Sequence, residues 1–326
     1  MKSFSLPTRC AARALAIAGL LVFNTAYSQE WPDKTVRIVV PFGPGGGTDI
    51  QGRLLSKKFY ESMGQTFVVD NRPGAAGLIG TEQVTKAAPD GYTILFTTAS
   101  LSVNVTLYQK TIAFDPVKDL VPVSWISSVP LVLVVHPTVP VKSVPELVTL
   151  AKKSAKMTAG SNGAGTTSFL AVEMLNQATG LKIVNVTYKG GGPAITALIG
   201  GEVDFEFATA LAAAPHLKSG KVRGLAVTTA KPAAAFPELP TMASVYPGFD
   251  VDNWYAMFMP AGTPKPIVDK LNAEIIKALK SADVQSYMAK EGGQPVGSTP
   301  QELAQMFNRE VTKYARVIGN AHIAAQ

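Results

Sequence analysis

Residues 36–50, VRIVVPFGPGGGTDI, contain the pattern that decides the fold. The run from Val36 to Pro41 is mostly apolar and β-branched, as in strands that are buried on both faces. A glycine-rich turn follows at residues 41–48, and a helical pattern runs from Thr48 to Met63. A strand, a tight turn and a helix in direct succession form the repeating unit of α/β proteins.

The same succession occurs at two further glycine-rich turns, GSNGAGTT (residues 160–167) and YKGGGPA (residues 188–194). Glycine lets the main chain approach a ligand closely. The free N–H groups of the first helical turn, together with the helix dipole, favour an anion there. One such turn is explained equally well as a tight connection, but three on one chain predict a site for an oxyanion.

Strands and helices alternate along the rest of the chain. Continuous apolar strands separated by helices predict an α/β protein with largely parallel sheets. Thr299, Pro300 and Glu302 form a capping box that predicts the start of the last helix. Strands are expected at residues 36–41, 66–69, 92–97, 131–135, 183–188, 203–207 and 222–228, and helices at 48–63, 144–154, 166–179, 264–280 and 300–318.

The first residues predict an exported protein. A basic segment precedes an apolar run from Ala14 to Phe23, and small residues stand at Ala26 and Ser28. This is the pattern of a secretory signal peptide at residues 1–28, cleaved after Ser28. The run is only about half of the ~20 residues that a membrane-spanning helix needs. We therefore expect an exported, soluble mature protein.

Composition narrows the class further. Removing 28 of the 326 residues leaves 298, enough for two lobes with separate cores. Lys2, Arg9 and Arg13 supply three of the seven net positive charges, so the exported chain carries +4, which does not indicate nucleic-acid binding. The only cysteine is Cys10, so disulfides, thiol catalysis and cysteine-bound zinc are excluded from the mature chain.

Two nucleotide-binding interpretations fail at particular residues. The first turn resembles a dinucleotide fingerprint, but Thr48 stands at its third glycine position, and Asp70 belongs to an Asn-Arg-Pro-Gly loop. The second turn resembles a Walker loop, but Thr166 occupies the position of the phosphate-binding lysine. No nucleotide or other cofactor is expected.

Catalytic interpretations are weaker still. The chain has no Gly-x-Ser-x-Gly elbow, and its three histidines are far apart, so neither a nucleophile–base pair nor a zinc signature is visible. Glu202, Asp204 and Glu206 alternate along an expected strand, which could suggest paired carboxylates or a metal site. A solvated strand face, or caps at the ends of the strand, is the preferred interpretation, and no enzyme activity is expected.

Several motifs in order resemble the substrate-binding proteins of tripartite tricarboxylate transporters, also called the Bordetella uptake gene family. The resemblance covers essentially the whole mature chain. The motifs are VPFGPGG (40–46), NRPGAAG (71–77), DGYTIL (90–95), GSNGAGTT (160–167), YKGGGPA (188–194), GGEVD (200–204), PHLKSGKVR (215–223), PT (240–241) and PAGTP (260–264).

The resemblance implies a type II periplasmic-binding-protein fold, with two α/β lobes and a ligand cleft between them. Residues 29–125 with 255–326 are expected to form lobe 1, and residues 126–254 lobe 2. Two crossing strands are expected near residues 121–137 and 246–259. The implied function is a monomeric solute receptor that captures a small carboxylate and delivers it to membrane permease subunits.

The resemblance also implies a carboxylate clamp made of backbone and hydroxyl groups, partly through ordered waters. Relatives in this family often have a histidine at position 169 and an acid at position 208, where this chain has Phe169 and Ala208. These departures favour a dicarboxylate, with an apolar or aromatic body, over an amino acid. The implied ligand-binding residues are Phe42, Gly43, Gly46, Thr98, Ser100, Ser161, Gly165, Thr166, Thr167, Phe169, Tyr188, Ala208 and Thr209.

Two alternatives remain open on sequence grounds. A sensor domain would pass the ligand-bound state to a signalling partner instead of a permease, and nothing in the sequence separates it from a transport receptor. An exported α/β hydrolase or transferase could use the same turns as oxyanion sites. The missing nucleophile and base argue against that second alternative.

Overall fold

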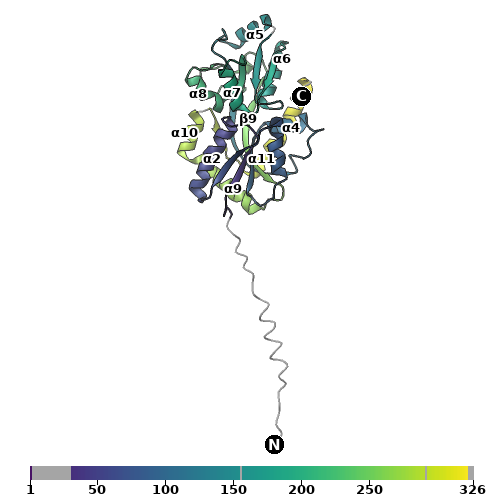
Figure 1. The fold of residues 1–326 in the computed structure, drawn as a ribbon, viewed down its shortest axis with the longest axis vertical. Coiled ribbons are helices and arrows are strands. Elements are labelled where there is room, and N and C mark those ends of the chain that lie inside the picture. Colours follow the sequence, from purple (N-terminus) through teal and green to yellow (C-terminus); the bar gives the residue numbers. More distant parts are fainter. Residues whose placement is uncertain (2–30, 155, 291, 322–326) are drawn as a thin grey trace.

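The computed structural model describes residue 1 and residues 31–154, 156–290 and 292–321. Two lobes lie one above the other in Figure 1, with α5 to α8 around the upper lobe and α2, α4 and α9 to α11 around the lower one. The expected signal peptide falls almost entirely outside the described residues. Its cleavage after Ser28 stays a prediction.

The lower lobe, here called the first lobe, is built on three parallel strands. β1 (Val36–Val40) pairs with β2 (Phe67–Asn71) on one side and β3 (Thr93–Thr98) on the other. Its apolar run is buried because a central strand is covered on both faces. The helices of this lobe are α2 (Gly47–Met63), α3 (Leu78–Thr85), α4 (Ser100–Leu107), α9 (Lys265–Lys280), α10 (Ala282–Lys290) and α11 (Pro300–Ala321).

The second lobe repeats this arrangement. β5 (Thr158–Ser161) lies between β6 (Val184–Thr187) and β7 (Phe205–Thr209) and pairs with both in parallel. Parallel strands need crossover connections, and helices provide them here. The helices are α5 (Val144–Lys153), α6 (Thr167–Thr179), α7 (Gly191–Ile199) and α8 (Ala210–Lys218).

Two long strands join the lobes. β4 (Leu120–Val135) pairs antiparallel with β9 (Asp252–Pro260) over its first part and with β7 and β8 (Arg223–Val227) over its last part. The resulting sheet runs β2-β1-β3-β9-β4-β7-β5-β6, with the two-residue strand β10 (Gln294–Pro295) also on β4. The β4–β9 register shifts after Pro122 and again after Trp125, which bends the pair.

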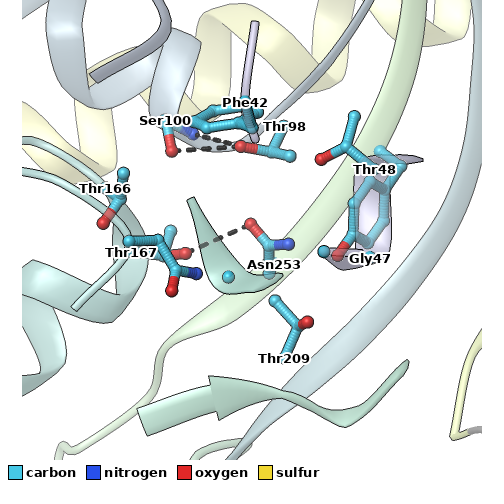
Figure 2. Close-up of a pocket in the computed structure, with 13 residues that line it drawn as sticks. Phe42, Gly47, Thr48, Thr98, Ser100, Thr166, Thr167, Thr209 and Asn253 are labelled. Carbon is cyan, nitrogen blue, oxygen red and sulfur yellow. Dashed lines mark hydrogen bonds between the residues drawn. The ribbon is translucent and has the colours of Figure 1, made fainter. Parts of the chain in front are cut away.

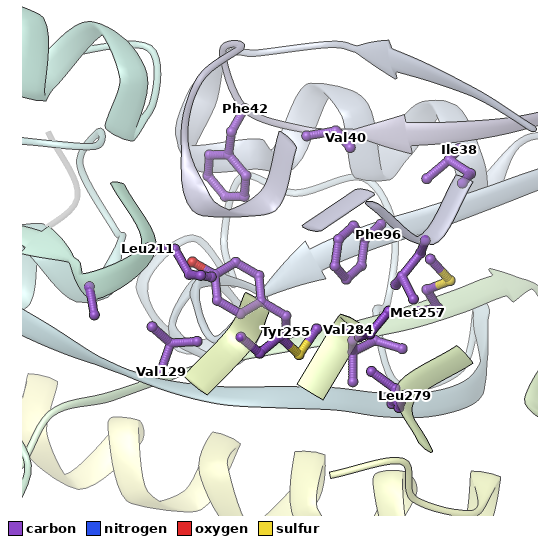
Figure 3. Packing of buried hydrophobic residues seen from close by; sticks show 14 of the residues in the cluster. Ile38, Val40, Phe42, Phe96, Val129, Leu211, Tyr255, Met257, Leu279 and Val284 are labelled. Carbon is purple, nitrogen blue, oxygen red and sulfur yellow. The ribbon is translucent and has the colours of Figure 1, made fainter. Parts of the chain in front are cut away.

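β9 is buried on both faces. Tyr255 and Met257 pack into the core shown in Figure 3, where the Tyr255 ring lies 6.1 Å from that of Phe96 in β3. Trp254 and Phe258 point the other way and contact Phe307 of α11. Because successive side chains of a strand alternate between faces, β9 is fixed from both sides.

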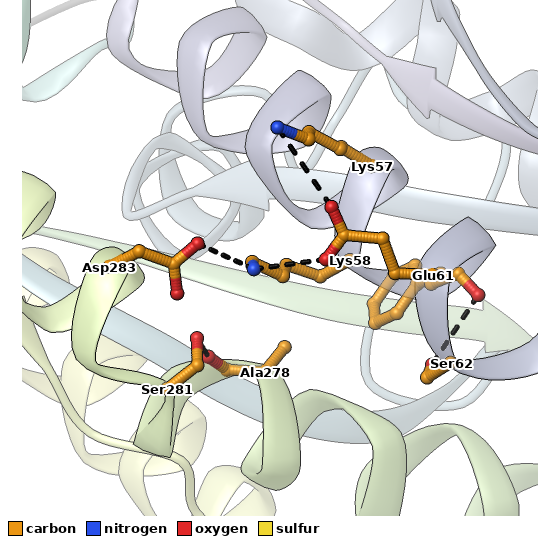
Figure 4. Close-up of polar contacts among 8 residues, drawn as sticks. Lys57, Lys58, Glu61, Ser62, Ala278, Ser281 and Asp283 are labelled. Carbon is orange, nitrogen blue, oxygen red and sulfur yellow. Dashed lines mark hydrogen bonds and ion pairs between the residues drawn. The ribbon is translucent and has the colours of Figure 1, made fainter.

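An ion-pair network ties α10 to α2 at the surface (Figure 4). Lys58 of α2 lies 3.0 Å from Glu61 of the same helix and also pairs with Asp283 of α10. Hydrogen bonding to the Lys58 ammonium lowers the pKa of Asp283 to about 2. Such exposed pairs add little to stability, so burial of apolar surface holds these helices in place.

The observed elements correct and extend the expectations from sequence. The sheet is mixed, because both crossing strands run antiparallel to their neighbours. The strand expected at 131–135 is only the end of β4. The capping box is confirmed, since Thr299 N–H donates to Glu302 Oε2 (2.8 Å) and Glu302 N–H donates to Thr299 Oγ1 (3.2 Å). Four helices were not anticipated: α3, α4, α8 and α10.

Candidate functional site

Five helices begin at one small cavity between the lobes (Figure 2). α2, α4, α6 and α7 begin at or next to lining residues, and Thr209, which also lines the cavity, is the N-cap of α8. The cavity has a volume of ≈ 20 Å³, room for one or two water-sized groups. The lining residues are Phe42, Gly46, Gly47, Thr48, Thr98, Ser100, Asn162, Thr166, Thr167, Gly191, Thr209, Asn253 and Tyr255.

The cavity suits an anion although no charged side chain lines it. The N-caps of α2 and α7 are Gly46 and Gly190, and neither helix has a side-chain cap. First-turn N–H groups without a cap can therefore serve a ligand. Each helix dipole adds partial positive charge at the same place. The field of several helix N-termini can thus attract an anion without a lysine or arginine side chain.

Hydroxyl groups supply further neutral donors. Thr98 ends β3 and Ser100 begins α4, and their side-chain oxygens lie 3.0 Å apart. Ser100 N–H donates to Thr98 Oγ1 at 3.2 Å, which holds this sharp turn from strand to helix. On the opposite wall Thr167 Oγ1 donates to Asn253 Oδ1 at 3.1 Å. Two lobes thus present hydroxyl groups to one space.

Tyr255 brings a phenol from the crossing strand β9. Its ring is fully buried, and a Cβ placed on Gly47 would lie 2.2 Å from the Tyr255 hydroxyl, so only glycine fits there. Burial raises the pKa of Tyr255, although Thr209 and Asn253 nearby act in the opposite direction. The phenol therefore stays protonated and can donate a hydrogen bond to a carboxylate.

Asp49, in the first turn of α2, directly follows the lining residue Thr48. Its Oδ2 accepts from Gly45 N–H and from Arg53 Nε, both at 3.0 Å. Burial by itself would raise the pKa of Asp49, but hydrogen bonds from Arg53, Gly45 and Asn71 lower it below its ordinary value. The carboxylate is thus engaged in shaping the turn, and it does not line the cavity.

The first and third glycine-rich turns touch each other across the lobes. Gly43 N–H donates to the Lys189 carbonyl oxygen at 2.7 Å. A Cβ on Gly192 would lie 2.0 Å from the Pro44 carbonyl oxygen, and a Cβ on Gly190 would lie 2.8 Å from Gly43 N. These glycines allow the main chains of the two lobes to touch each other. This role differs from the one expected from sequence, which was to let the main chain approach a ligand.

The structure brings together only part of the residue set expected from sequence. Phe42, Gly46, Thr98, Ser100, Thr166, Thr167 and Thr209 line the cavity. Tyr188 lines a neighbouring cavity instead, and Gly43 joins the two turns. Ser161, Gly165, Phe169 and Ala208 line neither cavity.

Each of the residues away from the cavities has an identifiable environment. Ala208 and Phe169 are 0% and 2% exposed, and Ala208 pairs with Val132 of β4 in the core. Ser161 is fully buried at the end of β5. A Cβ on Gly165 would lie 2.5 Å from Asn104 Oδ1, so this glycine lets α4 approach the second turn. A ligand preference set by Phe169 and Ala208 stays a prediction.

Six lining residues were missed from the sequence: Gly47, Thr48, Asn162, Gly191, Asn253 and Tyr255. Four of them lie inside or next to the glycine-rich turns, so the turn signal could have included them. Asn253 and Tyr255 lie on the crossing strand β9. Asparagine is uncommon in strands, so Asn253 was the residue in the sequence that could have drawn attention to this strand.

The acids between residues 202 and 206 do not form the solvated strand face preferred from sequence. Glu202 is exposed, but Glu206 is fully buried. Neither carboxyl oxygen of Glu206 has a hydrogen-bond partner, and burial raises its pKa well above the ordinary value. The expectation is wrong for Glu206, because β7 is an internal strand that leaves no face to solvent.

Comparison with known proteins now identifies the family. Residues 52–323 match the tripartite tricarboxylate transporter family receptor. The chain belongs to this receptor family. BugT of Bordetella pertussis, a relative of this receptor, is 35% identical over 94% of this chain and 96% of its own.

Solved structures agree with this assignment and confirm the two-lobed fold. R. palustris Rpa4515 with adipate is 35% identical to the receptor, with a TM-score of 0.87 over 90% of this chain and 99% of its own. MatC from Rhodopseudomonas palustris with bound malate is 32% identical, with a TM-score of 0.83 over 88% and 100% of the two chains. The resemblance noted in the sequence is therefore confirmed.

Within residues 31–321, apart from residues 155 and 291, no helix is long and apolar enough to cross a membrane. The same residues contain no group of three or more His, Cys, Asp or Glu side chains placed to hold a metal ion.

Proposed function

We propose that this periplasmic solute-binding receptor captures a small dicarboxylate, holding one carboxylate in the cavity where the five helices begin. The observation that carries the proposal is the convergence of helix N-termini and hydroxyl groups on a cavity without a charged side chain. The adipate and malate named for its structural relatives are both dicarboxylates, which supports the same ligand class here.

The energetics of such a clamp are sufficient. Hydrogen bonds to a charged group contribute about 1.5 to 3 kcal/mol each. Four such bonds at about 2.5 kcal/mol each contribute about 10 kcal/mol, more than the roughly 8 kcal/mol of micromolar affinity before the cost of ordering the ligand and loops is subtracted. The receptor therefore needs no lysine or arginine side chain in the clamp to bind a carboxylate with micromolar affinity.

Lobe closure is part of the proposal. The hinge is the β4–β9 pair, and the lobes are residues 29–125 with 255–326 and residues 126–254. The ligand favours the closed state by its differential affinity for that state. The closed receptor then delivers its ligand from the periplasm to membrane permease subunits.

Ligand release followed by mass spectrometry, with a thermal-shift panel, tests the proposal. Freshly purified receptor is denatured, released acids are identified, and melting is measured with adipate, malate, hexanoate and aspartate. A ligand at one hundred times its Kd adds about 2.7 kcal/mol to the free energy of unfolding. If no carboxylate shifts the melting temperature, the proposed function is wrong. Aspartate binding more tightly than adipate would contradict the preference for dicarboxylates without an amino group.

A further inference from the structure

A second, larger cavity adjoins the site of the five helix N-termini. Its volume is ≈ 400 Å³, compared with ≈ 20 Å³ for the inner cavity. Phe42 and Asn162 line both cavities, so the two spaces meet at these side chains. The inner cavity has room for one carboxylate but not for a whole dicarboxylate. The remainder of a ligand must therefore occupy other space.

The outer cavity differs from the inner one in its chemistry. Lys189 is the only charged residue that lines it, while Tyr108, Tyr188 and the Phe42 ring provide aromatic surface. Lys189 is exposed, and no acid among the described residues forms an ion pair with it. Glu202 accepts a hydrogen bond from the Tyr188 hydroxyl at 3.4 Å but does not line the cavity.

Both lobes build the walls of the outer cavity. Asn104 of α4 donates from Nδ2 to the Ala76 carbonyl oxygen at 2.9 Å, which fixes the 74–77 loop of the first lobe. On the other side the Lys189 carbonyl accepts from Gly43 N–H, so the main chain that bears this lysine is anchored to the first turn. The main chain of Lys189 is thereby held against the first turn, whose Phe42 lines both cavities.

We propose that the outer cavity is the distal subsite of the receptor, and that Lys189 selects a dicarboxylate over a monocarboxylate of equal length. This inference rests on the proposed function, since it needs one carboxylate in the inner cavity. The apolar body of the ligand passes Phe42 and Asn162 and lies beside Tyr108 and Tyr188. The second carboxylate pairs with the Lys189 ammonium, which forms no ion pair with an acid in the described part of the chain.

Calorimetric titration with adipate and hexanoate tests the distal subsite, because these acids differ in the distal carboxylate. Wild-type receptor should bind adipate more tightly than hexanoate. Lys189→Gln should weaken adipate binding about fivefold, the size expected for an exposed ion pair, and leave hexanoate binding unchanged. Lys189→Glu should weaken adipate binding further. Lys153→Gln, at an exposed position of α5, is the control and should change neither affinity.

The outcomes separate this inference from the proposed function. If both acids bind and Lys189→Gln leaves their affinity ratio unchanged, the distal subsite is wrong while the carboxylate clamp stands. If adipate, hexanoate and the other carboxylates of the thermal-shift panel all fail to bind, both proposals fail. A wild-type preference for adipate that weakens with added salt and is abolished by Lys189→Gln supports the subsite.

Discussion

At the scale of single residues, the described part of the candidate site presents buried neutral donors and no charged side chain. The Tyr255 phenol and the Thr209 hydroxyl oxygen are both buried without a hydrogen-bond partner in the protein, and both line the inner cavity. Leaving a buried polar group unsatisfied costs about 1 to 3 kcal/mol, so such groups gain by bonding a ligand. A carboxylate oxygen is a suitable acceptor for both hydroxyl groups.

Replacing Tyr255 by Phe tests this use of neutral donors. We expect Tyr255→Phe to weaken adipate binding about tenfold or more, because one hydrogen bond to a charged group is lost. Unfolding without ligand should change little, since the ring stays in the core. Calorimetric titration gives the affinity, and Tyr246→Phe, at a partly buried position outside both cavities, is the control. Unaltered adipate affinity in Tyr255→Phe would remove the phenol from the clamp.

Glu206 sets a pH dependence of stability. Its raised pKa means that the folded protein keeps a proton that the unfolded chain loses above the ordinary glutamate pKa of 4.5. The free energy of unfolding then falls with rising pH, by up to about 1.4 kcal/mol per pH unit, between that value and the folded-state pKa. Glu206→Gln should remove this contribution, so its stability relative to wild type should rise with pH.

Denaturant titrations at pH 4.5, 5.5 and 6.5 measure the effect of Glu206. Burial raises the pKa of Asp252 to about 6, so this group titrates in the same pH range. Because wild type and Glu206→Gln both contain Asp252, its contribution cancels in the stability difference between them. Glu238→Gln, at an exposed position, serves as the control. A stability difference between Glu206→Gln and wild type that stays constant with pH would show that Glu206 is not a buried neutral acid.

At the scale of elements, helix starts combine structural and binding roles. Thr166 is the N-cap of α6: its Oγ1 accepts from Phe169 N–H at 3.2 Å and donates to the Gly163 carbonyl at 2.8 Å. It also lines the inner cavity. Ser143 caps α5 in the same way, accepting from Glu146 N–H, but lies at neither cavity. The two caps allow the roles to be separated.

Thr166→Ala should lower the free energy of unfolding by about 1 kcal/mol, as loss of an N-cap typically does, and should also weaken adipate binding. Ser143→Ala should cause a similar loss of stability with unaltered binding. Thr166→Ser keeps the hydroxyl and should restore both properties. Denaturant unfolding and calorimetric titration measure the two effects. Equal adipate affinity in Thr166→Ala and Ser143→Ala would assign Thr166 to the helix cap alone.

At the scale of the whole molecule, closure depends on how closely the two lobes can approach each other. The main chains of the first and third glycine-rich turns are in contact. Gly43 N–H donates a hydrogen bond to the Lys189 carbonyl oxygen, and Gly192 packs against the Pro44 carbonyl oxygen. Packed main chains leave no space for a side chain. A methyl group at this contact should therefore act as a wedge between the lobes without disturbing either core.

Gly192→Ala provides such a wedge, because its Cβ would lie 2.0 Å from the Pro44 carbonyl oxygen. We expect adipate binding at least tenfold weaker, while stability without ligand changes little because alanine favours the helix that begins here. Small-angle X-ray scattering with adipate should give a larger radius of gyration than for wild type. Gly319→Ala, in open space on α11, is the control. Wild-type compactness and affinity in Gly192→Ala would refute closure through this contact.

The sequence by itself determined the α/β class and the three glycine-rich turns, and it led to the proposal of an anionic ligand, because all of these depend on local patterns. Strand hydrophobicity and glycine at helix starts act over a few residues. Thr98, Ser100, Thr166 and Thr167 could be assigned to the site because each lies at a strand end or helix start where these local rules hold.

Only the tertiary structure decided which of those residues face one another. Asn253 and Tyr255 enter the site because β9 crosses between the lobes, and Glu206 is buried because β7 becomes an internal strand. Gly43 and Gly192 allow the two lobes to touch, and the sequence of one turn does not show which other turn it will contact. Pairing between strands and turns that are distant in the sequence sets these contacts, and a local pattern carries no information about such pairing.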